Sequence, residues 1–173
     1  MSKKLYCMHL RNTILKEHSK KQILRIVDYV GNDKSRFDDL IQLFLHGEYR
    51  LSQRAAWAVS ICIEQHPELA EKYLTQILDN LKNPVHNAVV RNTVRIFDQI
   101  DIPEHLHARI MNICYDYVVD RNTPIAIKAY SLGILHKLSH TYPELKSELR
   151  GLIDDQMPTA TAAFKSRAKK IKL

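Results

Sequence analysis

The sequence contains few glycines and no long apolar run. Only four of its 173 residues are glycine, which argues against glycine-rich phosphate-binding loops and against a fold of many tight hairpins. No apolar segment approaches the roughly 18 residues that a membrane-spanning helix needs. The first stretch, MSKKLYCMHLRNT, has cations but neither an apolar centre nor a small-residue cleavage site. We therefore expect no secretory signal, no membrane association and a cytoplasmic location.

Cysteine is also scarce. Cys7, Cys62 and Cys114 are odd in number and far apart in the chain. This pattern does not suggest a disulfide framework, and free cysteine is among the most buried residue types. We expect buried free thiols in a reducing compartment.

The composition is that of a globular domain with a positive charge balance. Hydrophobic residues make up 45% and charged residues 26% of the chain, and 173 residues are enough for one domain with a real core. We expect a single domain over residues 1–173. The 26 Lys and Arg against 19 Asp and Glu give a net charge of +7. This excess permits nucleic acid, an anionic surface or an acidic protein as a partner, but it does not choose among them.

Apolar residues recur with helical spacing almost everywhere. In RFDDLIQLFLHG they stand at positions 37, 40, 41, 44 and 45, which places them on one face of a helix. No segment shows the alternation typical of a β-strand. The sequence therefore predicts an all-α fold.

Six prolines divide the chain into helix pairs. Pro67, Pro103 and Pro143 are each followed by Glu, and both residue types are favourable in the first turn of a helix. Pro84, Pro124 and Pro158 alternate with them and precede a second kind of helix. The expected pairs are 34–46 with 50–66, 68–82 with 85–101, 104–119 with 124–141, and 144–155 with 159–172. Residues 1–33 are expected to form a cap, with helices near 5–16 and 19–30.

A cation returns every 37 residues, at Arg54, Arg91, Lys128 and Lys165. Each stands at the same place in the second helix of its pair. A repeat of this length made of two helices indicates an α-solenoid, in which each pair packs on its neighbours. We predict about four such pairs after the cap.

The helix pairs resemble HEAT repeats, whose second helix commonly begins with a hydrophobic residue, a cation and then small residues. The stretches QRAAWAV, VRNTV, IKAYSL and FKSRA match this pattern to varying degrees. The family pattern also has an acid before the cation. Here Asp120 keeps that acid, whereas His46, Asn83 and Met157 stand at the equivalent positions.

A narrower resemblance concerns the stretches RAAWAV, KAYSLGILHKLSHTYPEL and TATAAFKSRAKKI. They are similar to a small bacterial HEAT-like family, some members of which carry an automatic label of adenylosuccinate lyase. True lyases of that superfamily have a signature of adjacent serines followed by Met-Pro, Lys and Asn. Met157-Pro158 lacks the rest of that signature, so no catalytic residue is carried over and we expect no enzyme.

Two interpretations of the recurring cations remain open. They can pair with acids of neighbouring repeats, or they can form a basic strip on the concave face, where the second helices of HEAT repeats usually lie. Arg95 and Lys169, one turn further along, would extend such a strip, and Trp57 is either a core residue or an aromatic anchor for a partner. The predicted binding residues are Arg54, Trp57, Arg91, Arg95, Lys128, Lys165 and Lys169.

The expected partner of the strip is another protein that presents an acidic surface. Nucleic acid, as in HEAT-like DNA-repair proteins, is the alternative, and an enzyme for a small anionic metabolite is a third hypothesis. His136 and His140 stand four residues apart on one helical face, but no third ligand has a suitable spacing. We expect no metal, no cofactor, and a monomer or weak oligomer.

Overall fold

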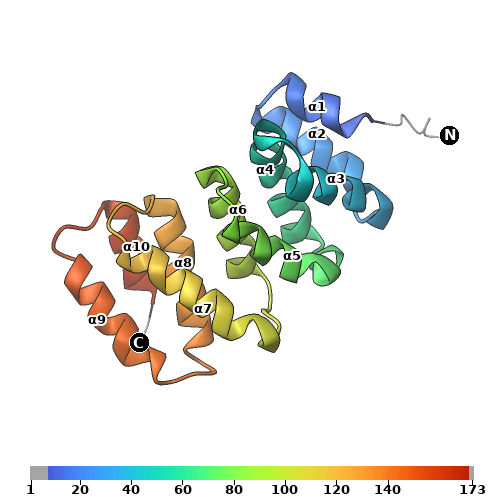
Figure 1. The fold of residues 1–173 in the computed structure, drawn as a ribbon. Helices are drawn as coiled ribbons and strands as arrows, with labels where there is room; N and C mark the ends of the chain where they lie inside the picture. The colour runs from blue at the N-terminus through green and yellow to red at the C-terminus, as the bar shows by residue number, and fades with distance from the viewer. Residues whose placement is uncertain (1–7, 172–173) are drawn as a thin grey trace. The chain divides into compact units, whose positions relative to one another are not determined.

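The computed structural model describes residues 8–171. Within this range it contains ten α-helices and no strand, together with three short 3-10 segments. The chain divides into two compact units, unit 1 up to Asn92 and unit 2 from Thr93 onward. Figure 1 shows the helices in chain order. The expected helical residues 5–7 and the predicted buried thiol of Cys7 lie outside the described part.

The helices of unit 1 are α1 (Leu10–Lys16), α2 (Lys20–Val30), α3 (Lys34–His46), α4 (Tyr49–Gln65) and α5 (Leu74–Asp79). Helix α6 (Asn87–Gln99) begins in unit 1 and ends in unit 2. The remaining helices of unit 2 are α7 (Glu104–Val119), α8 (Ile125–Leu138), α9 (Leu145–Gln156) and α10 (Ala162–Lys170).

The predicted helix 68–82 is not continuous. It consists of the 3-10 segments Pro67–Leu69 and Glu71–Tyr73, the short helix α5, and the 3-10 segment Asn80–Lys82. Its first backbone bonds span three residues, as in Ala70 to Pro67 and Tyr73 to Ala70, which is the tighter 3-10 pattern. The other predicted helices are found within a few residues of their expected bounds.

Helix starts follow ordinary capping chemistry. The side chains of Ser19, Asp33 and Thr161 accept hydrogen bonds from backbone N–H groups in the first turns of α2, α3 and α10. Pro103 and Pro124 immediately precede α7 and α8. The prolines and the capping residues thus set the boundaries that the sequence pattern indicates.

In unit 1, α4 packs on α1, α2 and α3. Helix α3 buries Phe37, Leu40, Ile41 and Phe44 completely. Helix α4 contributes small residues such as Ala55, which let neighbouring helices approach closely. Each large apolar side chain buried in this way contributes on the order of 1.5–3 kcal/mol to folding.

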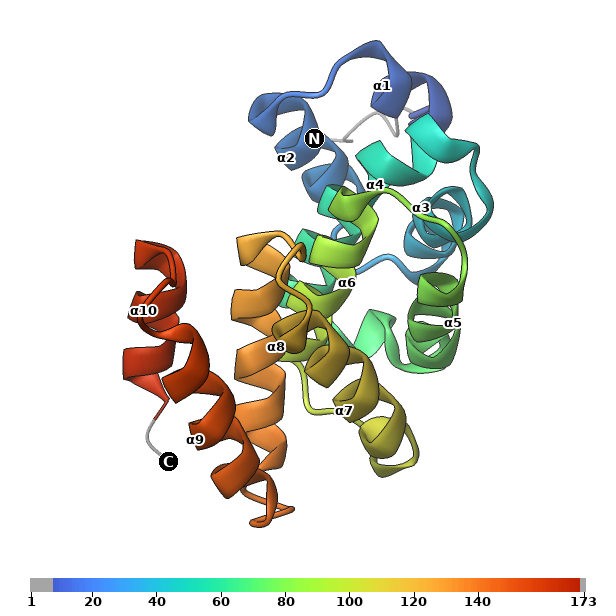
Figure 2. The same ribbon diagram turned by 60° about the vertical axis from the view of Figure 1, so that its left-hand side comes forward.

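In unit 2, α8 lies between α7 on one side and α9 and α10 on the other, as the two views agree (Figure 1, Figure 2). Its residues are buried on more than one face, because neighbours surround it. Gly133 stands in the middle of α8, where the Arg167 guanidinium of α10 bonds to the Asp98 carboxylate of α6 at 2.6 Å. A side chain at Gly133 would overlap this ion pair, since an added Cβ would lie 1.7 Å from Arg167 Nη2 and 2.1 Å from Asp98 Oδ1.

Polar side chains also join residues about one repeat apart. In unit 1, Arg11 pairs with Glu48, 37 residues later. In unit 2, the His107 ring lies 3.1 Å from the Tyr142 hydroxyl, 35 residues later. At these two places, residues about one repeat apart are therefore in contact.

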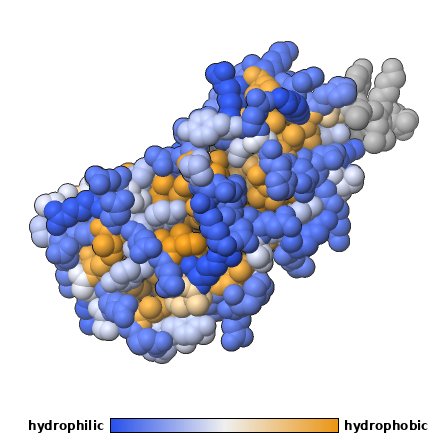
Figure 3. Space-filling model, viewed as in Figure 1, coloured by the Kyte–Doolittle hydropathy of each residue, from blue (hydrophilic) through white to orange (hydrophobic). Residues whose placement is uncertain are grey.

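Hydrophilic side chains cover much of the molecular face in Figure 3, with hydrophobic residues visible between them. The large hydrophobic side chains that stay exposed in the described part are Leu24, Tyr49, Tyr115 and Val119. They come from different helices and include two tyrosines, whose hydroxyls tolerate water. Scattered apolar exposure of this kind is normal for a protein surface.

Gly133→Ala is expected to destabilise the protein. The gain in helix propensity of alanine is roughly 0.5–1 kcal/mol, but displacing the partly buried Asp98–Arg167 pair costs more, so the net loss is about 1–2 kcal/mol. Gly151→Ala in α9 is the matched control, because an added Cβ there meets nothing within 4 Å. It should stabilise the protein by about 0.5–1 kcal/mol. Urea denaturation measures both changes, and equal effects would contradict the packing assigned to Gly133.

Cys62 and Cys114 are free and buried, as predicted for these two thiols. Burial raises the pKa of both to about 12, because the thiolate loses its hydration. We expect the Cys7→Ser variant to react slowly with Ellman's reagent at about pH 8 and rapidly after unfolding in guanidinium. Fast labelling of both thiols in the native state would show that they are accessible.

Candidate functional site

The four recurring cations occupy the same part of each second helix, as predicted. Arg54, Arg91, Lys128 and Lys165 lie in the first two turns of α4, α6, α8 and α10. Their environments differ, and none of them forms an ion pair with a carboxylate among residues 8–171. The pairing with acids that HEAT geometry suggested is therefore not how these cations are held.

Arg54 holds the end of another helix. Its Nη1 donates to the backbone carbonyls of Leu15 at 2.7 Å and Ile14 at 3.4 Å, in the last turn of α1. Carbonyls at a helix C-terminus lack partners within the helix, and a cation there also complements the helix dipole. The main role of Arg54 in this structure is to cap α1.

Arg91 is exposed on α6, and the described residues give it neither an ion pair nor a hydrogen bond. It lies close enough to His18, in the α1–α2 loop, to affect its charge. Loss of hydration lowers the pKa of His18 first, and the positive charges of Arg54 and Arg91 lower it further. At neutral pH His18 is therefore mostly uncharged.

Trp57 is partly buried on α4 and meets the His18 ring edge-on, with ring centroids 6.1 Å apart. His18, Arg54, Trp57 and Arg91 thus gather in unit 1, and we refer to them as the His18 cluster. The cluster combines one anchored arginine, one free arginine and two aromatic rings. Arg91, with its donors available, can bind an anionic group.

The predicted cations of unit 2 do not share one environment. Lys128 is only 6% exposed, Arg95 is partly buried, Lys165 is partly exposed, and Lys169 is exposed. Lys128 Nζ donates to Gln156 Oε1 at 3.2 Å. Asp120, the acid that keeps the HEAT pattern, instead accepts from Asn122 N and Thr123 Oγ1 in the turn before α8.

Other polar residues did not appear in the sequence-based prediction. Lys137 Nζ donates to three carbonyls at the end of α6, those of Phe97, Asp98 and Ile100, at 3.3, 2.7 and 2.7 Å. The ion pair of Asp98 and Arg167 joins residues 69 apart. Lys137 is not one of the cations that recur every 37 residues. Asp98 and Arg167 are 69 residues apart, which is not one repeat. The repeat period in the sequence therefore indicated neither Lys137 nor this ion pair.

The two histidines considered as metal ligands do lie together. The rings of His136 and His140 are 4.9 Å apart. Loss of hydration, followed by the charge of His140, lowers the pKa of His136. Within the described part of the chain no group of three His, Cys, Asp or Glu residues is arranged to hold a metal ion.

A family model described as the HEAT repeat domain matches residues 10–172. The chain belongs to the HEAT-repeat family. The all-α solenoid class predicted from the repeat period is thereby confirmed. HEAT repeats are commonly scaffolds for protein interactions and are generally non-catalytic. No curated protein and no solved structure matches this HEAT-repeat chain.

The likeness to the bacterial family with the lyase label stays a prediction, as does the single domain over residues 1–173. In the described HEAT repeats, no helix combines the length and the apolar character needed to cross a membrane.

The different roles of Arg54 and Arg91 can be tested by replacing each with methionine, which keeps an unbranched stem. Arg54→Met leaves the carbonyls at the end of α1 without their cation and should lower the free energy of unfolding by about 1–3 kcal/mol. Arg91→Met should change it by less than about 0.5 kcal/mol, as expected for a free surface residue. Denaturant titration measures both, and a large loss in Arg91→Met would reveal a structural partner.

Proposed function

We propose that this HEAT-repeat protein is a non-catalytic binding module for an acidic segment of another protein. The proposed site is the His18 cluster of unit 1. The observation that carries it is Arg91, an exposed arginine with no partner among the described residues, whose charge acts on the same His18 ring that meets the partly buried Trp57 edge-on. Arginine and tryptophan are the residue types that most often dominate binding energy at protein interfaces.

The chemistry of the cluster supports a protein ligand with one or two carboxylates. Arg54 already donates to the carbonyls of α1, and the depressed pKa of His18 leaves that ring mostly neutral. Arg91 is then the cation of the cluster with all its donors available. Tight binding to nucleic acid usually rests on several phosphate contacts made together, whereas one arginine beside an aromatic ring is enough to anchor an acidic peptide.

Nucleic acid is the second candidate, and the observation that favours it is on α10. Lys169 and Lys170 are exposed there, and Lys165 is partly exposed, with no ion pair to any described residue. Lys165 belongs to the predicted column of cations, and Lys169, with Arg95, was its predicted extension. They would attract a polyanion through charge alone.

Charge reversal at Arg91 tests the leading proposal. Affinity purification with the wild-type chain and with Arg91→Glu should recover a protein partner only with the wild type. Arg50→Glu is the matched control, since Arg50 is also an exposed arginine of unit 1 and the described residues give it no partner. With the purified partner, Arg91→Glu should raise the Kd at least about tenfold. Equal binding by all three chains would remove the His18 cluster from consideration.

The nucleic-acid alternative needs its own measurement. Fluorescence anisotropy with labelled single- and double-stranded DNA and RNA, at roughly 50 and 200 mM salt, separates the two candidates. Protein binding predicts weak signals at both salt concentrations. Tight binding that falls steeply with salt, and that charge reversal at Lys169 and Lys170 weakens, would replace the protein partner with a nucleic acid.

A further inference from the structure

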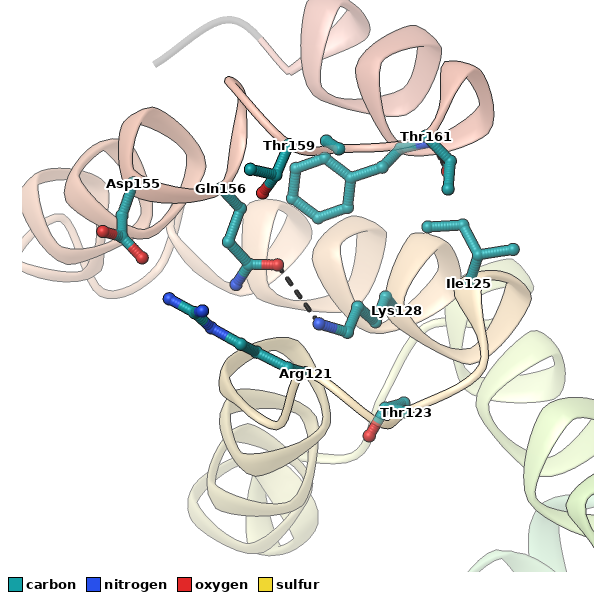
Figure 4. Close-up of a pocket in the computed structure, with 10 residues that line it drawn as sticks. Arg121, Thr123, Ile125, Lys128, Asp155, Gln156, Thr159 and Thr161 are labelled. Atoms are coloured by element: carbon teal, nitrogen blue, oxygen red, sulfur yellow. Dashed lines mark hydrogen bonds between the residues drawn. The ribbon is translucent and has the colours of Figure 1, made fainter.

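A pocket in unit 2 is lined by two cations. It has a volume of about 230 Å³ and lies where the start of α8, the end of α9 and the start of α10 meet. Arg121 and Lys128 line it, together with Asp155, Gln156 and the hydroxyl-bearing residues Thr123, Thr159 and Thr161. Figure 4 shows the Lys128 ammonium directed at the Gln156 amide, while the Arg121 side chain extends toward the Asp155 side of the pocket. We refer to it as the Lys128 pocket.

Lys128 is the unusual residue of the pocket. Its side chain is only 6% exposed, yet its ammonium has a single hydrogen bond, to Gln156 Oε1, and no carboxylate partner among the described residues. An ammonium has three N–H donors, and a buried charge is costly unless it is paired. Loss of hydration lowers the pKa of Lys128, and the nearby charge of Asp120 only partly opposes this effect.

Gln156 keeps Lys128 in place without neutralising it. Gln156 Nε2 donates to the carbonyl of Val118 at 2.7 Å, at the end of α7, while its Oε1 accepts from Lys128. The amide is therefore fixed at both ends, and its oxygen is turned toward the ammonium. The remaining donors of Lys128 are left for whatever occupies the pocket.

The rest of the lining adds donors and positive charge. Arg121 is exposed and has no ion pair or hydrogen bond within the described residues. Asp155 is the one carboxylate of the lining, so two cations stand against one acid. Asp120, outside the lining, already accepts hydrogen bonds from Asn122 and Thr123. Helix α8 also begins without a side-chain cap, although the N–H groups of Ile127 and Lys128 already donate to the Pro124 carbonyl.

We propose that the Lys128 pocket binds a phosphate monoester group. A phosphate dianion matches the charge of the two cations in the lining and offers three terminal oxygens to donors that come from different elements of the pocket. A carboxylate offers one charge and two oxygens, and it would leave some of the hydrogen-bond donors of the pocket without a partner. The volume exceeds that of a single water, whose share of the liquid is about 30 Å³, so a phosphate fits with room to spare.

The pocket is separate from the proposed protein-binding site. The His18 cluster belongs to unit 1, and the Lys128 pocket is built entirely from residues of unit 2. The two ligands also differ in chemistry. Either site can therefore fail its test while the other stands.

Binding can be followed by NMR on the full chain, through the backbone amides of residues 121–128 and 155–164. The probes are inorganic phosphate, N-acetyl-phosphoserine amide and N-acetyl-glutamate amide. The phosphate probes should cause saturable shifts in these two segments and bind at least about tenfold more tightly than the carboxylate. Tighter binding of phosphoserine than of inorganic phosphate supports a phosphate monoester, with a phosphorylated side chain as its source. The reverse order would overturn the monoester and leave free phosphate as the ligand.

Two variants test the roles of the cations. Lys128→Met and Arg121→Met should each weaken phosphate binding at least about tenfold. Lys146→Met is the control, because Lys146 is exposed in the same unit and does not line the pocket. Arg121 is on the surface, so its replacement leaves the fold intact, and Lys128→Met removes a buried charge and should not lower Tm. The proposal is wrong if phosphate causes no saturable shift in these segments, if the carboxylate binds as tightly, or if both variants bind like the wild type.

Discussion

The structure depends on hydrogen bonds that side chains of later helices donate to the backbone carbonyls in the last turn of earlier helices. Arg54 donates to the end of α1 from 39 and 40 residues away, and Lys137 donates to the end of α6 from 37 to 40 residues away. Gln156 does the same for α7 across 38 residues. Carbonyls at helix ends must find partners, and here the partner comes from about one repeat later. The bond therefore fixes the register between neighbouring repeats.

This constraint explains why one sequence position serves several purposes. The recurring cation always reaches the first two turns of a second helix, but its surroundings depend on which carbonyls and cavities lie nearby. Arg54 is used internally, whereas Arg91 remains on the surface without a partner and Lys128 is enclosed beside a pocket. A repeat protein can thus keep its packing pattern and still place distinct binding chemistry on different repeats.

The fold could be predicted from the sequence because its signals are local and periodic. Apolar spacing, prolines and the 37-residue return of a cation are each visible without any contact information. The segment 68–82 was predicted less well, since its 3-10 turns depend on contacts such as the Tyr73 hydroxyl with Asp38. The candidate site was harder still. His18 lies in a loop outside any repeat pattern, and no spacing rule connects the buried Lys128 with its hydrogen-bond partner Gln156. Burial and side-chain pairing are properties of the packed structure.

The Asp98–Arg167 pair has a consequence for the order in which unit 2 is completed. The two residues are 69 positions apart, so at typical rates of protein synthesis Asp98 is made on the order of several seconds before Arg167. Until α10 arrives, the Asp98 carboxylate that lies against Gly133 of α8 lacks its counter-charge. A growing chain therefore cannot finish this unit early, and its last helix acts as the closing step of assembly.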